Sequence, residues 1–391
     1  MLTSRPLGMF TGTTVFMAFS CLFVINGLGL GNSTRCHAVI EHLVAAGCDV
    51  HVLTSGNGLT YFAGRPEITS LGSMPSFFYG ATNSGISGWS TLRTLPRLLK
   101  IAREKRAQLG AWVDRLKPDV AVVDSEYTLS PLRRRKIPIV AINNSEVVVT
   151  EYLKRRGKAR GTSSHFWFIE FSDFLFHRRF GDLVLSPFPL DTPTRAPNFR
   201  RVGLILRPAV ERVALAGAGP ATRLPQEVRT VVCMLSGSVH ASQIDFGDGH
   251  FPFAVEVVGR SGESRGNVTF HGRQMDNIAL LERADVLVIN GGYSALSEAL
   301  AFGKPTFVLP VPGHAEQFVN ARLACDLGLG FAATEQDVFP RLLEMHRRNS
   351  WIGREPRHPD LCFNGAEQAA EAILGLANAR QKVCAPSLAT P

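Results

Sequence analysis

The chain has 391 residues, which is more than one hydrophobic core usually organises, so we expect two domains. Hydrophobic residues make up 45% and charged residues 19% of the sequence, and this balance excludes disordered and fibrous proteins. The seven cysteines are scattered, with no CxxC pair and no Cys/His cluster in the sequence. A disulfide framework and a structural zinc site are therefore not indicated, and a cytoplasmic location fits best.

The net charge of +9 raises the question of a nucleic-acid partner. The basic residues gather in two local clusters, at residues 133–136 and 154–160. Neither cluster alternates with the stacking aromatic side chains that single-strand binders use, so we predict no nucleic-acid partner. Solvated surface charge is the simplest interpretation, and an anionic acceptor or an acidic membrane surface is the alternative.

Near the start of the chain, residues 14–25 (TVFMAFSCLFVI) form an apolar run as long as a signal peptide. A glycine-rich turn follows this run instead of a small-residue cleavage site, and the run is too short to span a bilayer. We therefore predict a buried strand over residues 20–25. Met9 and Met17 are alternative starts.

Apolar strand-like runs alternate with helical patterns through the first half of the chain. We predict strands at residues 20–25, 50–53, 120–123 and 137–142, and helices at residues 33–46 and 98–116. Strands and helices that alternate through short connections imply right-handed crossovers and a parallel sheet.

Prolines recur between residues 185 and 220, which suits a connection between domains. The alternation then restarts. We predict strands at residues 231–235, 253–258, 268–271, 286–290 and 306–309, and helices at residues 275–283, 294–302 and 316–326. The predicted fold is α/β, with two Rossmann-like, doubly wound domains facing a cleft. The ranges are 14–190 for the first domain, 191–225 for the connection and 226–378 for the second domain.

The strongest functional signal lies in residues 284–330. Gly291 and Gly292 end a predicted strand, and Ser294 is placed to cap the helix that follows. Two glycines let a backbone approach a ligand, and a helix N-terminus offers N–H groups and a positive dipole end, so this turn suits a diphosphate. Ser297 and Glu298 lie near the first turn of the helix, where the carboxylate either favours the dipole or accepts from a ribose diol.

A second polar group follows the next predicted strand. It consists of His314, Glu316, Gln317 and Asn320. Because the carboxyl ends of neighbouring parallel strands meet at one edge of the sheet, this group is expected beside the glycine turn, where ligands bind in open α/β sheets.

These residues resemble the donor-binding region of GT-B glycosyltransferases, in particular the MurG and UDP-glucuronosyltransferase families. The shared pattern is a strand, GG-x-(S/T)-x-x-(S/T)-E, a G-x-P strand and an H-x-x-Q-x-x-N-A turn, which fall here at residues 291–298, 303–305 and 314–321. The resemblance implies a nucleoside-diphosphate sugar as co-substrate and no other cofactor. The implied contacts are to the diphosphate near Gly291, Gly292 and His314, to the ribose by Glu298, and to the sugar by Glu316 and Gln317.

Three weaker similarities support this assignment. Arg207, in VGLILRP, is similar to an interdomain arginine that contacts the donor phosphates, although an arginine before proline is more often a linker residue. Ser236 and Gly237 follow the first strand of the second half, where related enzymes have a phosphate loop. Phe270 and Met275 either resemble the stretch that reads the nucleobase or belong to the core. No DxD-type acidic pair lies near the phosphate loop, so no metal is predicted.

The glycine turn at residues 27–35 is predicted to face the donor through Gly29 and Gly31. No acidic residue ends the second strand, which argues against a nicotinamide cofactor. In the GT-B families a histidine commonly occupies the position of Asn32 and serves as general base. Asparagine cannot take a proton near neutral pH, so we expect Asn32 to orient the reacting groups.

The base is then expected to be a carboxylate, and Asp124 and Glu126 end the strand at residues 120–123. A cap or a solvated group is the alternative interpretation of both.

The predicted function is transfer of a hexosyl or deoxysugar group from a UDP or dTDP sugar to an acceptor hydroxyl. A small bacterial metabolite, such as an aminocyclitol intermediate of antibiotic biosynthesis, is the first choice of acceptor. A lipid-linked or cell-envelope saccharide is the second, since the aromatic stretch at residues 166–180 adjoins a basic cluster and would give peripheral membrane contact. The same residues are also compatible with a nucleotide-sugar hydrolase or epimerase of the same fold, and with a non-catalytic nucleotide-sugar-binding protein.

Overall fold

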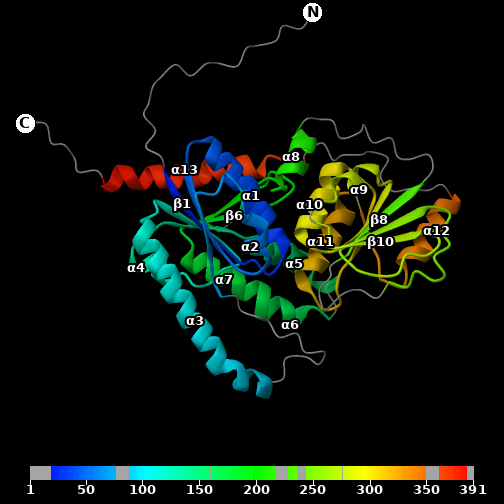
Figure 1. Cartoon of the computed structure of the whole chain (residues 1–391). Helices are drawn as coiled ribbons and strands as arrows, with labels where there is room; N and C mark the ends of the chain where they lie inside the picture. Colours follow the sequence, from blue (N-terminus) through cyan, green and yellow to red (C-terminus); the bar gives the residue numbers. More distant parts are fainter. Residues whose placement is uncertain are drawn as a thin grey trace, which may run out of the picture.

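The computed structural model describes residues 19–75, 88–158, 161–194, 196–215, 228–235, 244–274, 276–328, 330–348 and 361–384. They form two α/β domains that lie side by side (Figure 1). Ser236, Gly237 and Met275 lie outside the described residues.

The first domain is built on a parallel sheet with the strand order β3-β2-β1-β4-β5-β6-β7. Its strands are β1 (Ser20–Ile25), β2 (Asp49–Thr54), β3 (Ser70–Ser73), β4 (Val120–Asp124), β5 (Ile139–Ile142), β6 (Leu183–Pro187) and β7 (Phe199–Val202). All residues of β4 and β5 are buried, because helices cover both faces of a doubly wound sheet and make its central strands continuously apolar. The predicted strand at residues 20–25 is confirmed as β1.

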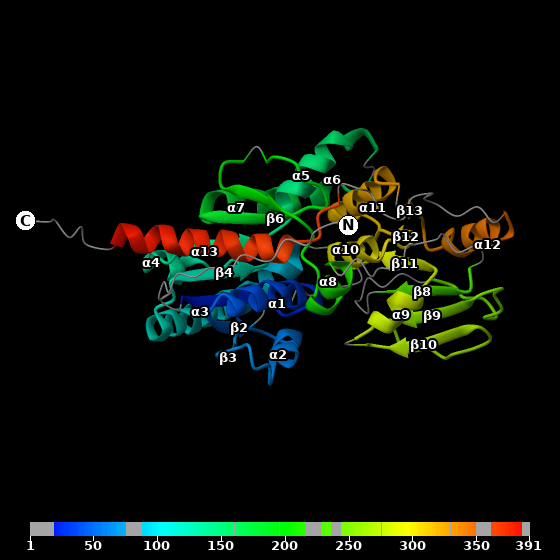
Figure 2. The same cartoon turned by 90° about the horizontal axis from the view of Figure 1, so that it is seen from above.

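Helices flank this sheet on both sides (Figure 2). They are α1 (Leu30–Ala45), α2 (Asn57–Phe62), α3 (Gly88–Leu116), α4 (Ser130–Arg134), α5 (Ser145–Lys154), a 3₁₀ turn (Arg156–Lys158), α6 (Ser163–His165), a π-helix (Phe166–Glu170) and α7 (Phe171–Phe180). Helix α8 (Pro208–Leu215) lies between the two domains, and its Val210 packs with core residues of the second domain (Figure 2).

The second domain repeats the plan with the strand order β10-β9-β8-β11-β12-β13. Its strands are β8 (Thr230–Met234), β9 (Ala254–Val258), β10 (Val268–Gly272), β11 (Val286–Asn290), β12 (Thr306–Leu309) and β13 (Gly330–Ala332). Its helices are α9 (Ile278–Arg283), α10 (Tyr293–Phe302), α11 (Ala315–Asp326) and α12 (Val338–Arg348). The strands and helices predicted for this half are confirmed, and the predicted fold class of two doubly wound parallel-sheet domains is confirmed with them.

The domain ranges differ from the predicted ones in two places. Strand β7 lies inside the predicted connection but pairs with β6 in the first sheet. Helix α13 (Gly365–Cys384) lies partly inside the predicted second domain but packs along α1 of the first domain (Figure 2). Its small and apolar residues, including Ala366, Ala369 and Ile373, join the core of the first domain. Long-range packing of this kind leaves no local signal in the sequence.

The chain therefore crosses between the domains twice, and the two crossings are hydrogen-bonded to each other. The N–H of Cys362 donates to the carbonyl of Pro189 at 2.8 Å, and the N–H of Leu204 donates to the carbonyl of Cys362 at 2.8 Å. This pairing fixes where the second domain is attached.

The two domains also meet along α5, the π-helix and α11. Apolar side chains from both domains form one buried cluster there, with Tyr152 and Phe166 from the first domain and Ala315 and Val319 from the second. Within the described ranges, no helix is long and apolar enough to cross a membrane.

Candidate active site

The turn between β11 and α10 leaves the first turn of the helix open to an anion. Gly292 occupies the N-cap position with an extended backbone and gives no side-chain cap. The prediction that Ser294 caps the helix is wrong, because α10 already begins at Tyr293 and a cap residue must precede the first helical residue. The N–H groups at this end have no helical partner, and an anion is a suitable acceptor for them.

The two glycines of this turn are required for different reasons. A Cβ atom on Gly291 would lie 2.7 Å from the Cβ atom of Gln317, so this glycine allows α11 to pack closely. A Cβ atom on Gly292 would meet nothing within 4 Å. Open space therefore lies in front of Gly292, whereas Gly291 serves the packing of the domain.

Three of the polar residues predicted to contact the donor hold the turns of the second domain together. The amide of Asn320 donates to the carbonyl of Gly291 at 2.8 Å, and the hydroxyl of Ser297 donates to the carbonyl of Tyr293 at 2.9 Å. The side-chain oxygen of Gln317 accepts from the N–H of Val311 at 2.9 Å. These bonds set the shape of the β11–α10 and β12–α11 turns.

Arg207 and Glu298, which the sequence analysis assigned to the donor phosphates and ribose, form an ion pair. Nε of Arg207 lies 2.9 Å from one carboxylate oxygen of Glu298, and Nη2 donates to the other at 3.1 Å. Arg207 also donates to the side-chain oxygen of Asn277. Burial raises the pKa of Glu298, and the charge of Arg207 works against that rise. Both side chains keep some solvent contact, at 12% and 14% exposure.

The glycine turn of the first domain touches the turn of the second. A Cβ atom on Gly31 would lie 2.8 Å from Oγ of Ser294, while one on Gly29 would meet nothing within 4 Å. Gly29 is the N-cap of α1 and, like Gly292, gives no side-chain cap. The first turns of α1 and α10 are thus neighbours, and their two positive dipole ends together suit a ligand with more than one negative charge.

Asn32, Arg35 and Asp124 form one network behind the first-domain turn. Nε and Nη2 of Arg35 each donate to a carboxylate oxygen of Asp124 at 2.6 Å. Asn32 donates to the carbonyl of Asn26 at 3.1 Å, and its side-chain oxygen accepts from Arg35 at 3.4 Å. Burial disfavours the charged guanidinium, but the carboxylate of Asp124 holds the pKa of Arg35 above its ordinary value. Asp124 itself is fully buried.

Glu126, the other carboxylate considered as a base, is also buried and paired. It accepts from Nζ of Lys105 at 2.5 Å and from the N–H groups of Tyr127 and Thr128 at 3.1 and 2.9 Å. A general base must reach the proton it removes. In this structure each of the two carboxylates is buried and instead pairs with a cation.

The remaining predicted residues lie at the edges of this region. Glu316, in the first turn of α11, accepts from the amide of Asn144 in the first domain at 2.9 Å. Phe270 lies on the edge strand β10, where its ring packs against Phe246 with a centroid distance of 5.5 Å.

Comparison with known proteins decides the family. The sequence model of glycosyl transferase family 1 matches residues 19–163 and 247–348, which include both glycine turns and the residues of the β12–α11 turn. The chain belongs to this family.

Individual relatives agree with the family assignment. An uncharacterized glycosyltransferase of Methanosarcina acetivorans is 25% identical over 79% of this chain and 82% of its own length. A UDP-N-acetylglucosamine transferase of Nocardioides sp., acting on a pyrophosphoryl-undecaprenol muramyl acceptor by its name, is 26% identical over 62% of this chain and 67% of its own length. The crystal structure of the glycosyltransferase SnogD from Streptomyces nogalater superposes with a TM-score of 0.53 at 17% identity, covering 94% of this chain and 99% of that one.

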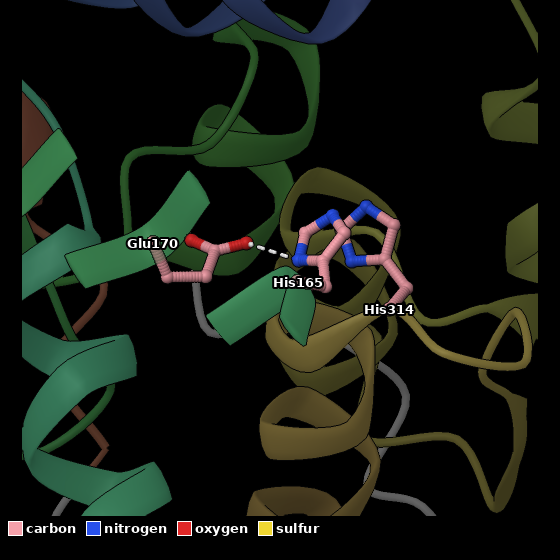
Figure 3. A group of neighbouring side chains, drawn as sticks. All are labelled: His165, Glu170 and His314. Atoms are coloured by element: carbon pink, nitrogen blue, oxygen red, sulfur yellow. Dashed lines mark ion pairs between the residues drawn. The ribbon is translucent and has the colours of Figure 1, made fainter. Parts of the chain in front are cut away.

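This glycosyltransferase also brings together three residues that the sequence analysis did not connect: His165, Glu170 and His314 (Figure 3). Nδ1 of His165 lies 3.4 Å from a carboxylate oxygen of Glu170, and the rings of His165 and His314 are 4.3 Å apart between centroids. His314 is the N-cap of α11, with Nδ1 3.5 Å from the N–H of Gln317. The first two residues come from one domain and the third from the other.

Burial shifts both titratable groups of the first domain in this cluster. Burial, followed by the charge of His314, lowers the pKa of His165 to about 4. Burial, followed by the nearby carboxylates of Glu316 and Asp173, raises the pKa of Glu170 to about 9. No sequence signal connects His165 and Glu170, because residues five apart do not share a face of an α-helix, whereas the π-helix between them brings them together.

Proposed function

We propose that the protein transfers a sugar from a nucleoside-diphosphate sugar, with UDP or dTDP as the leaving group, to a hydroxyl of the acceptor. The observation that carries this proposal is the contact between Gly31 and Ser294, which joins two uncapped helix N-termini at one place. A departing diphosphate gains negative charge as the bond to the anomeric carbon breaks, and preorganised N–H groups stabilise such charge. The name of the relative from Nocardioides supports a UDP sugar as donor.

The roles of the donor-side residues follow from their places in the site. The backbone at Gly292 and the guanidinium of Arg207 would hold the diphosphate, and Glu298 would accept from the ribose diol. Glu316, in the first turn of α11, would contact the sugar, and the diphosphate would lie near His314 at the N-cap of the same helix.

On the acceptor side, the reaction forms a bond between the acceptor oxygen and the anomeric carbon and releases the hydroxyl proton. We assign Asn32 to aligning the reacting groups, with Arg35 and Asp124 holding it in place. Asp124 is fully buried and paired with Arg35, so we assign it to positioning Asn32 rather than to taking the proton. Glu126 is held by Lys105 and two backbone groups, so we assign it to the fold.

An exposed apolar patch favours an amphiphilic acceptor over a freely soluble one. Trp167, Phe168 and Ile169, consecutive residues of the π-helix, are 42%, 77% and 48% exposed. The exposed side chains of Lys154 and Arg156 lie just before this segment in the chain. Apolar side chains beside basic ones suit an anionic membrane surface, where a lipid-linked saccharide would be met. A small metabolite such as an aminocyclitol remains the competing acceptor.

The test is an assay of nucleotide release and product formation with UDP and dTDP sugars. Each donor is offered with no acceptor, with soluble aminocyclitols, and with a lipid-linked saccharide in anionic vesicles. Release that needs an acceptor supports transfer. Release without any acceptor would instead make the protein a hydrolase or epimerase, and donor binding with no turnover would make it a binding protein.

A substitution in the exposed apolar patch tests whether the acceptor is met at a membrane surface. Phe168→Gln should lower activity on the vesicle-borne acceptor and leave nucleotide binding unchanged. Leu99→Gln is the matched control, since Leu99 is also an exposed apolar side chain, at 62%, but lies on α3. Equal activity of both variants on vesicles would overturn the membrane-surface acceptor.

A further inference from the structure

The cluster of His165, Glu170 and His314 has the composition and spacing of a metal site. One possible ligand atom from each residue lies within 4.8 Å of the other two. In a tetrahedral zinc site, with bonds of about 2.0–2.2 Å, ligand atoms are about 3.3–3.6 Å apart. The separation of 3.4 Å between Nδ1 of His165 and the carboxylate of Glu170 already falls in that range.

The backbone presents two of the ligands on one face. His165 ends α6, and Glu170 ends the π-helix that follows it. Because a π-helix bonds residues five apart, it places these side chains one above the other. Such π-helical turns are rare and occur frequently at functional sites.

The same cluster holds a buried polar atom without a hydrogen-bond partner. Nδ1 of His165 is buried, and no hydrogen-bond donor or acceptor of suitable geometry meets it within the described part of the chain. Glu170 is also buried, and the carboxylates of Glu316 and Asp173 act on it electrostatically. A cation would supply the missing partner for the imidazole and would favour the charged form of Glu170.

We propose that His165, Glu170 and His314 bind a divalent transition-metal ion of the zinc class across the domain interface. Two imidazoles and one carboxylate are a ligand set that zinc accepts, and the fourth position would be left for water or another ligand. No metal is predicted from the sequence, because no DxD-type acidic pair lies near the phosphate loop. These three ligands have no recognisable spacing in the sequence.

The first effect of a metal at this site would be structural. It would join the π-helix of the first domain to the N-terminus of α11 in the second, where His314 and Glu316 lie. Binding would then stabilise this arrangement of the two domains. The inference does not depend on the proposed transfer reaction, since it concerns binding of the metal alone.

The experiment is titration of the chelator-treated full chain with Zn²⁺ by calorimetry and with Co²⁺ by visible absorption. We expect one ion per chain, a tetrahedral Co²⁺ spectrum and a higher melting temperature with Zn²⁺. His165→Asn and Glu170→Gln should each weaken Zn²⁺ binding by more than about 100-fold, beyond the 10- to 100-fold usual for a lost second-shell partner. His314 is left unchanged, because its variant would also disturb the proposed donor site.

His271→Asn is the matched control. His271 also pairs with a glutamate, Glu256, at 2.5 Å, but it belongs to no group of three potential ligands within the described residues. Wild-type Zn²⁺ affinity in His165→Asn and Glu170→Gln, or equal losses in all three variants, would overturn the site. Because His165 is partly exposed, His165→Asn should fold, and thermal melting without metal checks this. Donor binding measured in chelator shows separately whether the proposed function holds.

Discussion

Each domain places one arginine–carboxylate pair behind its glycine turn, and the carboxylates of the two pairs differ in their access to solvent. In the first domain, Arg35 holds Asp124, whose side chain is fully buried. In the second, Arg207 holds Glu298, and both side chains keep some exposure. A pair with a fully buried carboxylate is hard to open, because breaking it would leave that carboxylate without solvent or partner. A carboxylate that keeps some solvent contact can exchange its arginine for a ligand. We therefore expect the first pair to stabilise the fold and the second to bind the donor.

The largest effect is expected from Asp124→Asn. Removing one partner of a buried pair leaves the charge of Arg35 uncompensated, so the free energy of unfolding should fall by about 3 to 5 kcal/mol. Urea denaturation measures it. Asp114→Asn is the control, because Asp114 pairs with Arg135 at the surface and should change little. If Asp124→Asn keeps its stability and loses only kcat, Asp124 acts in the reaction and the contrast between the two pairs fails.

A smaller effect, on binding rather than folding, is expected from Glu298→Gln. A hydrogen bond to a charged group contributes about 1.5 to 3 kcal/mol, so donor affinity should fall by about 10- to 150-fold. Calorimetric titration with UDP sugars measures this loss. Glu282→Gln, at an exposed position of α9, should bind as wild type does. Unchanged affinity in Glu298→Gln would remove the carboxylate from the site.

The neighbouring glycines Gly291 and Gly292 give a comparison within a single turn. Gly291→Ala forces a Cβ atom against Gln317, so it should destabilise the fold by about 1 to 3 kcal/mol. Gly292→Ala meets no atom of the protein and should cost at most about 1 kcal/mol of stability, yet weaken donor binding. Thermal melting with and without donor separates the two effects. Donor binding that survives Gly292→Ala would show that the ligand does not approach this turn.

The smallest effect is expected at the rim of the domain interface. Asp326→Asn removes a cross-domain ion pair with Arg155, but Asp326 is 56% exposed and solvent screens the pair. The stability loss should be under about 1 kcal/mol. A loss of several kcal/mol in thermal melting would mean that the domains depend on this pair more than on their apolar contact.

The sequence was sufficient for the order of the elements and the place of the candidate site. Strands such as β11 and β12 are short apolar runs bounded by glycine or proline, and parallel strands bring their carboxyl ends to one edge. The GG turn and His314 could be placed on that rule alone. That rule does not predict the hydrogen-bond partner of each polar side chain. Asn320 donates to the carbonyl of Gly291 inside the protein, which its position in a motif does not reveal.

Contacts between residues far apart in the chain could not be predicted either, because a motif does not show which distant side chain will be its partner. The pairing of Asp124 with Arg35 and of Glu126 with Lys105 joins residues far apart in the chain, and no spacing encodes it. Arg35 follows Asn32 by about one helical turn, so it could have been noticed as a neighbour on the same face. His165 and Glu170 depend on a π-helix, for which the apolar periodicity gives no signal.

The return of α13 to the first domain has a consequence for how the protein is made. On a ribosome, domains generally begin to fold as their N-terminal parts emerge. Here the apolar face of α1 that α13 covers must wait until the whole second domain has been synthesised. During that interval the incomplete first domain exposes apolar surface. The yield of native enzyme would then depend on a chaperone or on rapid docking of α13. A chain truncated before α13 should accumulate as aggregate even though both sheets are encoded in full.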